Sequence, residues 1–169
     1  MGSIDVRHLT APAPLSSDHI LEAFRCTEPS LERWLKDRAR KNEAQGASRT
    51  YVVATNREVV GYYCLSAGAV AHEGAASSIR RNMPDPIPVI VLGRLAVHQD
   101  WASKGIGTGL LKDAVIRSIA AAEGLGVRAI LCHAISPRAG DFYLKHGFVQ
   151  SPIDPLTLML NLTALASKR

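Results

Sequence analysis

Residues 91–109 read VLGRLAVHQDWASKGIGTG. An apolar strand over Val89–His98 is followed by a short polar break and then by a turn with glycine at positions 105, 107 and 109. The pattern predicts a helix over Ile106–Glu123 directly after the turn. Glycine allows backbone conformations that a Cβ forbids, so successive N–H groups can converge on an anion at the start of this helix. The stretch therefore predicts a ligand that carries phosphate.

Two widespread phosphate-binding motifs do not fit this turn. A dinucleotide-binding fingerprint, G-x-G-x-x-G, follows its strand directly, but here the strand ends near Val97 and Leu110 takes the place of the third glycine. The mononucleotide P-loop pattern, G-x-x-x-x-G-K-[ST], does not occur in the chain. The spacing therefore argues against nucleotide chemistry of either kind.

The turn resembles the loop that binds the pyrophosphate of acetyl-coenzyme A in the GNAT family of N-acetyltransferases. The family pattern is [RQ]-x-x-G-x-[GA], and residues 102–107 read ASKGIG. Ala102 stands where the family has Arg or Gln, and we expect Lys104 to supply the missing positive charge. A plain structural turn is the alternative. The resemblance implies acetyl-coenzyme A as co-substrate, held by Ser103, Lys104, Gly105, Ile106, Gly107, Thr108 and Gly109.

Residues 136–148, SPRAGDFYLKHGF, carry a second match. Ser136 can cap a helix over Pro137–His146, and Gly147 can end it. An ordinary amphipathic helix would show the same spacing. The pattern Phe-Tyr-x-x-x-Gly-Phe resembles the penultimate helix and following strand of the acetyltransferases. The resemblance implies that Tyr143 is the general acid near the sulfur of the coenzyme, and that Phe142 contacts the coenzyme.

Acetyl transfer from a thioester to an amine requires a neutral amine, stabilisation of an oxyanion and a proton for the departing thiolate. No motif places a Glu or His as a strong base. An α-amine, whose reference pKa is about 8, is already partly neutral at physiological pH. Because the central strands of the family splay apart, we assign the oxyanion and pantetheine contacts to backbone N–H groups of Leu95, Ala96 and Val97.

Length and composition agree with one compact enzyme. The chain has 169 residues, of which 47% are hydrophobic and 21% charged, so we expect a single domain over residues 1–169, which the resemblance implies is an acetyltransferase domain. No apolar run is long enough to span a bilayer, and the N-terminus lacks the apolar core of a signal peptide, which predicts a cytoplasmic protein without membrane contacts. The three cysteines and six histidines show no metal-binding spacing, so no metal is expected.

The order of the expected elements predicts an α/β fold with a mixed central sheet and helices on both faces, which is the GNAT order. A short hairpin at 56–58 joins the second and third strands. The expected strands are Ile4–Leu9, Thr50–Thr55, Val59–Ala71, Val89–His98, Val127–Ala134 and Thr157–Leu162. The expected helices are Asp18–Cys26, Pro29–Gln45, Ile106–Glu123 and Pro137–His146.

The positive charges are unevenly placed along a chain of net charge +5. Arg38 falls within the apolar stripe of its helix, either snorkelling at the edge of the core or aimed into a cleft. Arg94 interrupts a buried-looking strand, where a charge must reach solvent or an anion. Solvated surface is the default for each charge taken singly. Together the candidates suggest a polyanionic acceptor bound by Arg33, Lys36, Arg38, Arg40, Arg80, Arg81 and Arg94.

This pattern resembles one branch of the family, the acetyltransferase toxins of bacterial toxin–antitoxin systems. The resemblance is carried by residues 91–97, 104–107 and 142–148. It implies acetylation of the α-amine of aminoacyl-tRNA, which stops translation, and a small antitoxin with a ribbon-helix-helix part. A homodimer could form through the apolar stretch 156–160. Two other functions stay open, namely acetylation of a small amine and a non-catalytic acyl-coenzyme A sensor.

Overall fold

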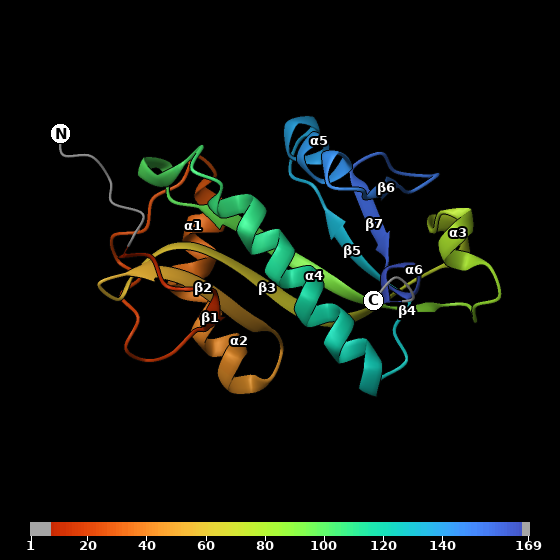
Figure 1. The fold of residues 1–169 in the computed structure, drawn as a ribbon, viewed down its shortest axis with the longest axis horizontal. Coiled ribbons are helices and arrows are strands. Elements are labelled where there is room, and N and C mark those ends of the chain that lie inside the picture. Colours follow the sequence, from red (N-terminus) through yellow and green to blue (C-terminus); the bar gives the residue numbers. More distant parts are fainter. Residues whose placement is uncertain (1–7, 167–169) are drawn as a thin grey trace. The chain divides into compact units, whose positions relative to one another are not determined.

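The computed structural model describes residues 8–166, and contacts divide the chain into two compact units. Unit 1 contains the described residues up to Leu65 together with Arg94–Ala114, and unit 2 contains Ser66–Gly93 and the described residues from Val115 on. The strands pair in the order β1-β2-β3-β4-β5-β7-β6 (Figure 1). The β4–β5 pair is parallel, whereas β2–β3 and β5–β7 are antiparallel. The expected α/β class with a mixed sheet is confirmed.

Unit 1 combines part of the sheet with two whole helices and the beginning of a third. Its elements are β1 (Ala13–Pro14), α1 (Pro29–Asp37), α2 (Ala39–Gln45), β2 (Arg49–Thr55), the first part of β3 (Glu58–Val70), the end of β4 (Ile87–Val97), the 3-10 turn η3 (Gln99–Trp101) and the first turns of α4 (Ile106–Gly124). Asn56 and Arg57 both have positive φ, 48° and 69°, as a two-residue hairpin turn requires. The hairpin expected between β2 and β3 is therefore confirmed.

The two faces of β3 in unit 1 carry different helices. Tyr62 faces a core that includes Leu35 of α1 and Ala39 of α2. On the other face, a Cβ on Gly61 would lie only 3.1 Å from Ile106 Cγ2 and from Leu110 Cδ1 of α4. Glycine at this position lets the first turns of α4 lie directly against the strand.

Unit 2 has its own core and contains the rest of β3, β4 and α4 together with further elements. These are η2 (His72–Gly74), α3 (Ser77–Arg80), β5 (Ala129–His133), α5 (Pro137–Lys145), β6 (Val149–Gln150), β7 (Thr157–Asn161) and α6 (Leu162–Ala166). Ile79 of α3 packs with Ile87, Leu131 and Met159 in one buried cluster. Ser136 caps α5 by accepting from the Ala139 N–H at 3.2 Å, and Gly147 follows the helix with φ +92°, as the sequence predicts.

Several boundaries differ from expectation. The helix expected over Asp18–Cys26 is wrong, because this segment forms turns whose Ile20 N–H donates to the Arg57 carbonyl. The helix expected over Pro29–Gln45 is interrupted at Arg38, where φ is −122°. Most of the strand expected over Ile4–Leu9 lies outside the described residues. The structure adds elements that the sequence did not predict, namely β1, η2, α3, η3, β6 and α6.

None of the described helices combines the length and hydropathy needed to cross a membrane.

Candidate active site

The glycine turn in unit 1, residues 103–109, has the backbone conformation of an anion-binding loop and is called the cradle below. Ser103 and Gly105 both adopt left-handed conformations, with φ of +61° and +81°. The Gly105 carbonyl accepts from the Gly109 N–H at 3.0 Å, so the N–H groups of residues 106–108 have no acceptor within the helix. A Cβ on Gly105 would meet nothing within 4 Å, which shows that its conformation, rather than crowding, calls for glycine. The N-terminus of α4 is thus a cluster of hydrogen-bond donors with a partial positive charge.

The side chains around the cradle divide into an anchor and an open rim. Ile106 is buried and fixes the first turn of α4, whereas Ser103, Lys104 and Thr108 are exposed. Lys104 can therefore reach an anion in solvent beside the cradle, as the sequence suggests. The strand β4 runs toward this turn, with Ala96 buried in the core of unit 1 and its neighbours Leu95 and Val97 half-buried.

Arg94 of β4 lies on an aromatic platform. Its guanidinium carbon is 4.6 Å from the centroid of the Trp34 ring. The Trp34 ring also stacks on the ring of Tyr62, with a centroid distance of 5.9 Å and an interplanar angle of 8°. The Tyr62 hydroxyl donates to the Leu31 carbonyl at 2.6 Å, and burial raises the pKa of this phenol. Sequence reasoning missed the contact between Trp34 and Arg94.

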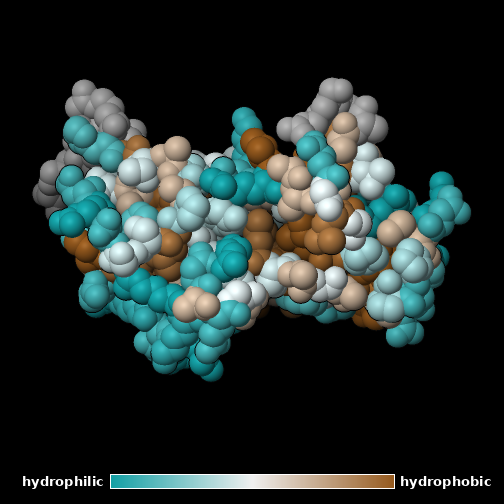
Figure 2. All heavy atoms as spheres, turned by 90° about the horizontal axis from the view of Figure 1, so that it is seen from below, coloured by the Kyte–Doolittle hydropathy of each residue, from teal (hydrophilic) through white to brown (hydrophobic). Residues whose placement is uncertain are grey.

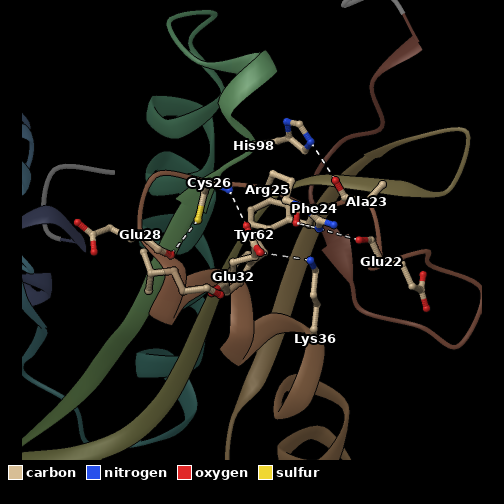
Figure 3. A network of polar contacts seen from close by, with 11 residues as sticks. Glu22, Ala23, Phe24, Arg25, Cys26, Glu28, Glu32, Lys36, Tyr62 and His98 are labelled. Atoms are coloured by element: carbon tan, nitrogen blue, oxygen red, sulfur yellow. Dashed lines mark hydrogen bonds and ion pairs between the residues drawn. The ribbon is translucent and has the colours of Figure 1, made fainter.

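His98, directly after β4, ties the end of the strand to the segment before α1 (Figure 3). Its Nδ1 accepts from the Asp100 N–H at 3.1 Å, so Nε2 carries the proton toward the Ala23 carbonyl, 3.1 Å away. The Phe24 ring meets the His98 ring edge-on at 5.9 Å. The Gln99 N–H adds a bond to the Arg25 carbonyl at 2.8 Å. Both ring nitrogens of His98 are therefore engaged.

The same segment contains a polar network around Glu32 of α1 (Figure 3). One carboxylate oxygen accepts from the Cys26 N–H at 3.2 Å, and the other lies 3.4 Å from Lys36 Nζ. Desolvation raises the pKa of Glu32, but the Cys26 hydrogen bond and the Lys36 charge outweigh it and leave that pKa below its usual value. The Cys26 thiol donates to the Glu28 carbonyl, and burial raises its pKa.

The four basic residues around α1 and α2 that are candidates for acceptor binding differ in their contacts. Lys36 is paired with Glu32, and Arg40 donates to the backbone carbonyls of Ser16 and His19. Arg33 and Arg38 are exposed, Arg38 at the junction of the two helices. Figure 2 shows a hydrophilic surface over α2. The structure thus separates two solvent-facing arginines from two cations that also hold unit 1 together.

Tyr143 lies in unit 2, on the buried side of α5. Its residue is 8% exposed, and its ring contacts those of Phe142 and Phe148 at centroid distances of 5.2 and 5.4 Å. Burial, assisted by the Cys132 thiol, raises the pKa of Tyr143, so the side chain is a neutral phenol at physiological pH. Burial also raises the pKa of Cys132, to about 12. The Tyr143 hydroxyl can therefore act as a hydrogen-bond or proton donor and not as a phenolate base.

Arg80 and Arg81 also lie in unit 2 and are exposed. Arg80 is the last residue of the helix α3, and Arg81 directly follows it. Arg128 stabilises that helix end, because its guanidinium donates to the carbonyls of Ser78 and Ile79. The structure therefore brings the cradle, residues 95–97, Arg94 and the basic residues of α1 and α2 into unit 1, and Phe142, Tyr143, Arg80 and Arg81 into unit 2.

Residues 46–150 match the family model described as an acetyltransferase (GNAT) domain. The chain belongs to the GNAT acetyltransferase family. It is 46% identical over 151 residues to a protein named tRNA-acetylating toxin from Mycobacterium tuberculosis (strain ATCC 25618 / H37Rv), an alignment that covers 89% of this chain and 91% of that protein.

Two solved structures share the fold of this GNAT acetyltransferase. The toxin AtaT complexed with acetyl-methionyl-tRNAfMet has a TM-score of 0.87 at 24% identity, covering 95% of this chain and 98% of AtaT. A tyrosine-to-phenylalanine mutant of AtaT bound to the C-terminus of the antitoxin AtaR has a TM-score of 0.81 at 23% identity, covering 95% of this chain and 98% of that one.

As a GNAT acetyltransferase, the protein uses acetyl-coenzyme A as acetyl donor. The backbone of the glycine turn fits the anionic part of this co-substrate, because a left-handed Gly105 leads into a helix N-terminus whose first N–H groups lack an acceptor within the helix. Among residues 8–166, no group of three His, Cys, Asp or Glu side chains is arranged to hold a metal ion.

Proposed function

We propose that this protein is the toxin of a toxin–antitoxin pair and transfers acetyl from acetyl-coenzyme A to the α-amine of aminoacyl-tRNA, which stops translation. The observation that carries the proposal is the 46% identity, over 89% of this chain, to a tRNA-acetylating toxin. The fold shared with AtaT, which was solved with acetyl-methionyl-tRNAfMet, is consistent with it.

The co-substrate is bound in this proposal by the cradle of unit 1. The N–H groups of Ile106, Gly107 and Thr108 donate to the pyrophosphate, and Ser103, Gly105 and Gly109 shape the turn, while Lys104 adds a positive charge from the exposed rim. Backbone N–H groups of Leu95, Ala96 and Val97 serve the thioester oxygen and the pantetheine amides. Phe142 of unit 2 contributes an apolar contact to the coenzyme.

The transfer forms a C–N bond between the amine and the acetyl carbon and breaks the C–S bond of the thioester. One proton leaves the amine, and one proton must reach the departing sulfur. Tyr143 donates to that sulfur, and it is neutral and able to do so because burial raises the pKa of its hydroxyl. Its ring is held by Phe142 and Phe148, which fixes the direction of the hydroxyl.

The acceptor's phosphates are bound by cations in this proposal. Arg94 presents a planar guanidinium backed by the Trp34 ring, which favours a directional contact with a phosphate oxygen. The exposed Arg33 and Arg38 add charge without a competing carboxylate in any ion pair of the described residues. Lys36, Arg40, Arg80 and Arg81 strengthen the positive field that attracts tRNA.

The remaining partners follow from the same proposal. A small antitoxin with a ribbon-helix-helix part binds the toxin, as suggested by the AtaT structure with the C-terminus of AtaR. We also propose that residues 1–169 act as one acetyltransferase domain, that two copies form a homodimer, and that the protein works in the cytoplasm, where aminoacyl-tRNA is used.

The deciding experiment measures transfer of labelled acetyl from acetyl-coenzyme A to a total aminoacyl-tRNA pool. Deacylated tRNA and a panel of small amines are the controls. We expect label on charged tRNA that is released by mild ester hydrolysis as an N-acetyl amino acid. Label on small amines alone would assign the enzyme to small-molecule acetylation, and binding of coenzyme without any transfer would point to a sensor.

A further inference from the structure

The first two turns of α4 are fixed to β3 at two points within unit 1. At the first point, the place of a Cβ on Gly61 is only 3.1 Å from side-chain atoms of Ile106 and Leu110. At the second point, the Tyr63 hydroxyl donates to the Asp113 carboxylate. Positions 61 and 63 share one face of the strand, and positions 106, 110 and 113 share one face of the helix. The two contacts therefore belong to one interface.

The donor at the second point is itself held in place. Tyr63 is fully buried, and its ring stacks on Tyr51 at 5.2 Å with an interplanar angle of 23°. These two residues are direct partners in the β2–β3 ladder. A buried phenol whose ring is stacked in this way delivers its hydroxyl to one place, and the hydrogen bond to a carboxylate is of the stronger, charge-assisted kind.

This interface sets the direction of the anion cradle. Ile106, which makes the contact at Gly61, directly follows Gly105, so the cradle N–H groups lie at the end of the helix that the strand holds. Asp113 lies seven residues further on, which is about 10 Å along the helix. One close contact near the helix end and one hydrogen bond about 10 Å away together fix both the position and the tilt of the donors.

We propose that Gly61 and Tyr63, the latter through Asp113, are positioning residues for acetyl-coenzyme A, holding the cradle on the pyrophosphate without touching it. The inference rests on the proposed assignment of the cradle to the coenzyme. Hydrogen-bond donors are effective only in the right geometry, so a small change in helix tilt weakens binding of the coenzyme. The acetyl carbon and Tyr143 are not part of this interface, so turnover at saturating coenzyme is retained.

The neighbouring tyrosine supplies a matched control. Tyr62 is also fully buried and also loses one hydroxyl hydrogen bond on conversion to Phe, but its partner is Leu31 of α1 on the other face of β3. For Tyr63→Phe we expect the Kd of coenzyme A and the KM for acetyl-coenzyme A to rise about fivefold, with kcat within about twofold of the parent. For Tyr62→Phe we expect a fall in Tm similar to that caused by Tyr63→Phe, but an unchanged Kd of coenzyme A.

Calorimetry with coenzyme A, steady-state kinetics and thermal melts on the full chain give these values. Equal effects of the two substitutions on the Kd, or no effect of Tyr63→Phe, would overturn the inference. Asp113→Asn keeps an acceptor oxygen and is expected to bind coenzyme A almost like the parent. Asp113→Leu should weaken binding as much as Tyr63→Phe does, and the double variant should be no weaker than either single variant, because all three lose the same contact.

A variant of the cradle separates the failure of this inference from the failure of the cradle assignment. If Gly105→Asp leaves the Kd of coenzyme A unchanged, the cradle itself is misassigned. If Gly105→Asp abolishes binding while Tyr63→Phe behaves like Tyr62→Phe, the cradle stands and the positioning role is refuted.

Discussion

The guanidinium of Arg94 and the indole of Trp34 form a cation–π pair, with 4.6 Å between the guanidinium carbon and the ring centroid. Tyr62 stacks on the same indole. The pair explains how β4 tolerates a charge next to the buried Ala96, since the aromatic face replaces part of the lost hydration. A flat, backed guanidinium also keeps its N–H groups directed along its edges, where a phosphate oxygen can accept two of them.

Replacing Arg94 by Lys should therefore weaken the use of the acceptor more than the binding of the coenzyme. Lys keeps the charge but loses the planar fork, so we expect kcat/KM for aminoacyl-tRNA to fall about tenfold, with the Kd of coenzyme A unchanged. Arg49→Lys is the control, because Arg49 pairs with Glu43 on the surface of unit 1 at 2.9 Å. Equal kinetics for the two variants would remove Arg94 from acceptor binding.

Tyr143→Phe removes only the hydroxyl and leaves the ring contacts with Phe142 and Phe148. A general acid contributes roughly 10²-fold or more to a proton-dependent step, so kcat should fall by about that factor. Calorimetry should show the affinity for acetyl-coenzyme A nearly unchanged. Parallel losses of turnover and affinity would instead make Tyr143 a packing residue.

Gly105→Asp should abolish coenzyme binding, because it puts a side chain and a negative charge beside the pyrophosphate in a left-handed conformation. Gly46→Asp is a matched control. Gly46 also has a left-handed φ, +71°, with nothing within 4 Å of its Cβ position, but it ends α2. Both variants should lose stability through strain, and calorimetry should show lost affinity in the first alone.

Exchanging Arg33 and Arg38 for Glu tests the solvent-facing charges of α1 and α2. These two are chosen because Lys36 and Arg40 also make structural contacts, so their loss would confuse binding with folding. The salt dependence of aminoacyl-tRNA binding should flatten by about one to two units in the log–log slope. A slope equal to that of the parent would assign this surface to solvent or to the antitoxin.

The pH profile of turnover should rise with deprotonation of the acceptor amine and show no loss due to Tyr143 below about pH 10. The absence of an effect of Tyr143 on this profile follows from burial, which raises the pKa of the Tyr143 phenol and keeps its proton in place throughout this range. Initial rates between pH 6 and about 9.5 check this expectation. A falling alkaline limb in the parent that disappears in Tyr143→Phe would contradict it.

The sequence correctly predicted those elements whose ends are marked by a capping residue, a proline or a glycine. Ser136, Pro137 and Gly147 mark α5, and the structure confirms their capping roles. The positive φ of Gly105 likewise agrees with the glycine turn read from the sequence. In these places the backbone conformation depends on residues within one or two turns, which the sequence displays directly.

Where contacts between residues far apart in the sequence decide the local structure, the sequence patterns were misleading. Leu21 and Phe24 are buried with a spacing of three, which imitates a helix, but Ile20 bridges to Glu58 and the backbone of the segment bonds to the β2–β3 hairpin instead. Nor does any local pattern pair Tyr63 with Asp113 or Arg94 with Trp34, because those contacts exist only after strand and helix have packed. The roles assigned to the site residues remain predictions.

The hydrogen bonds of His98 have a consequence for the choice of acceptor. With Nδ1 accepting from the Asp100 N–H and Nε2 directed to the Ala23 carbonyl, both ring nitrogens of this imidazole are already used in hydrogen bonds to the backbone. An acetyltransferase that leaves deprotonation of the amine to solvent acts on acceptors that arrive uncharged. Weakly basic amines, such as those next to an ester, meet this condition, whereas a lysine side chain, with a reference pKa of about 10.4, does not. Proton affinity would then act as a filter that spares the lysines of cellular proteins.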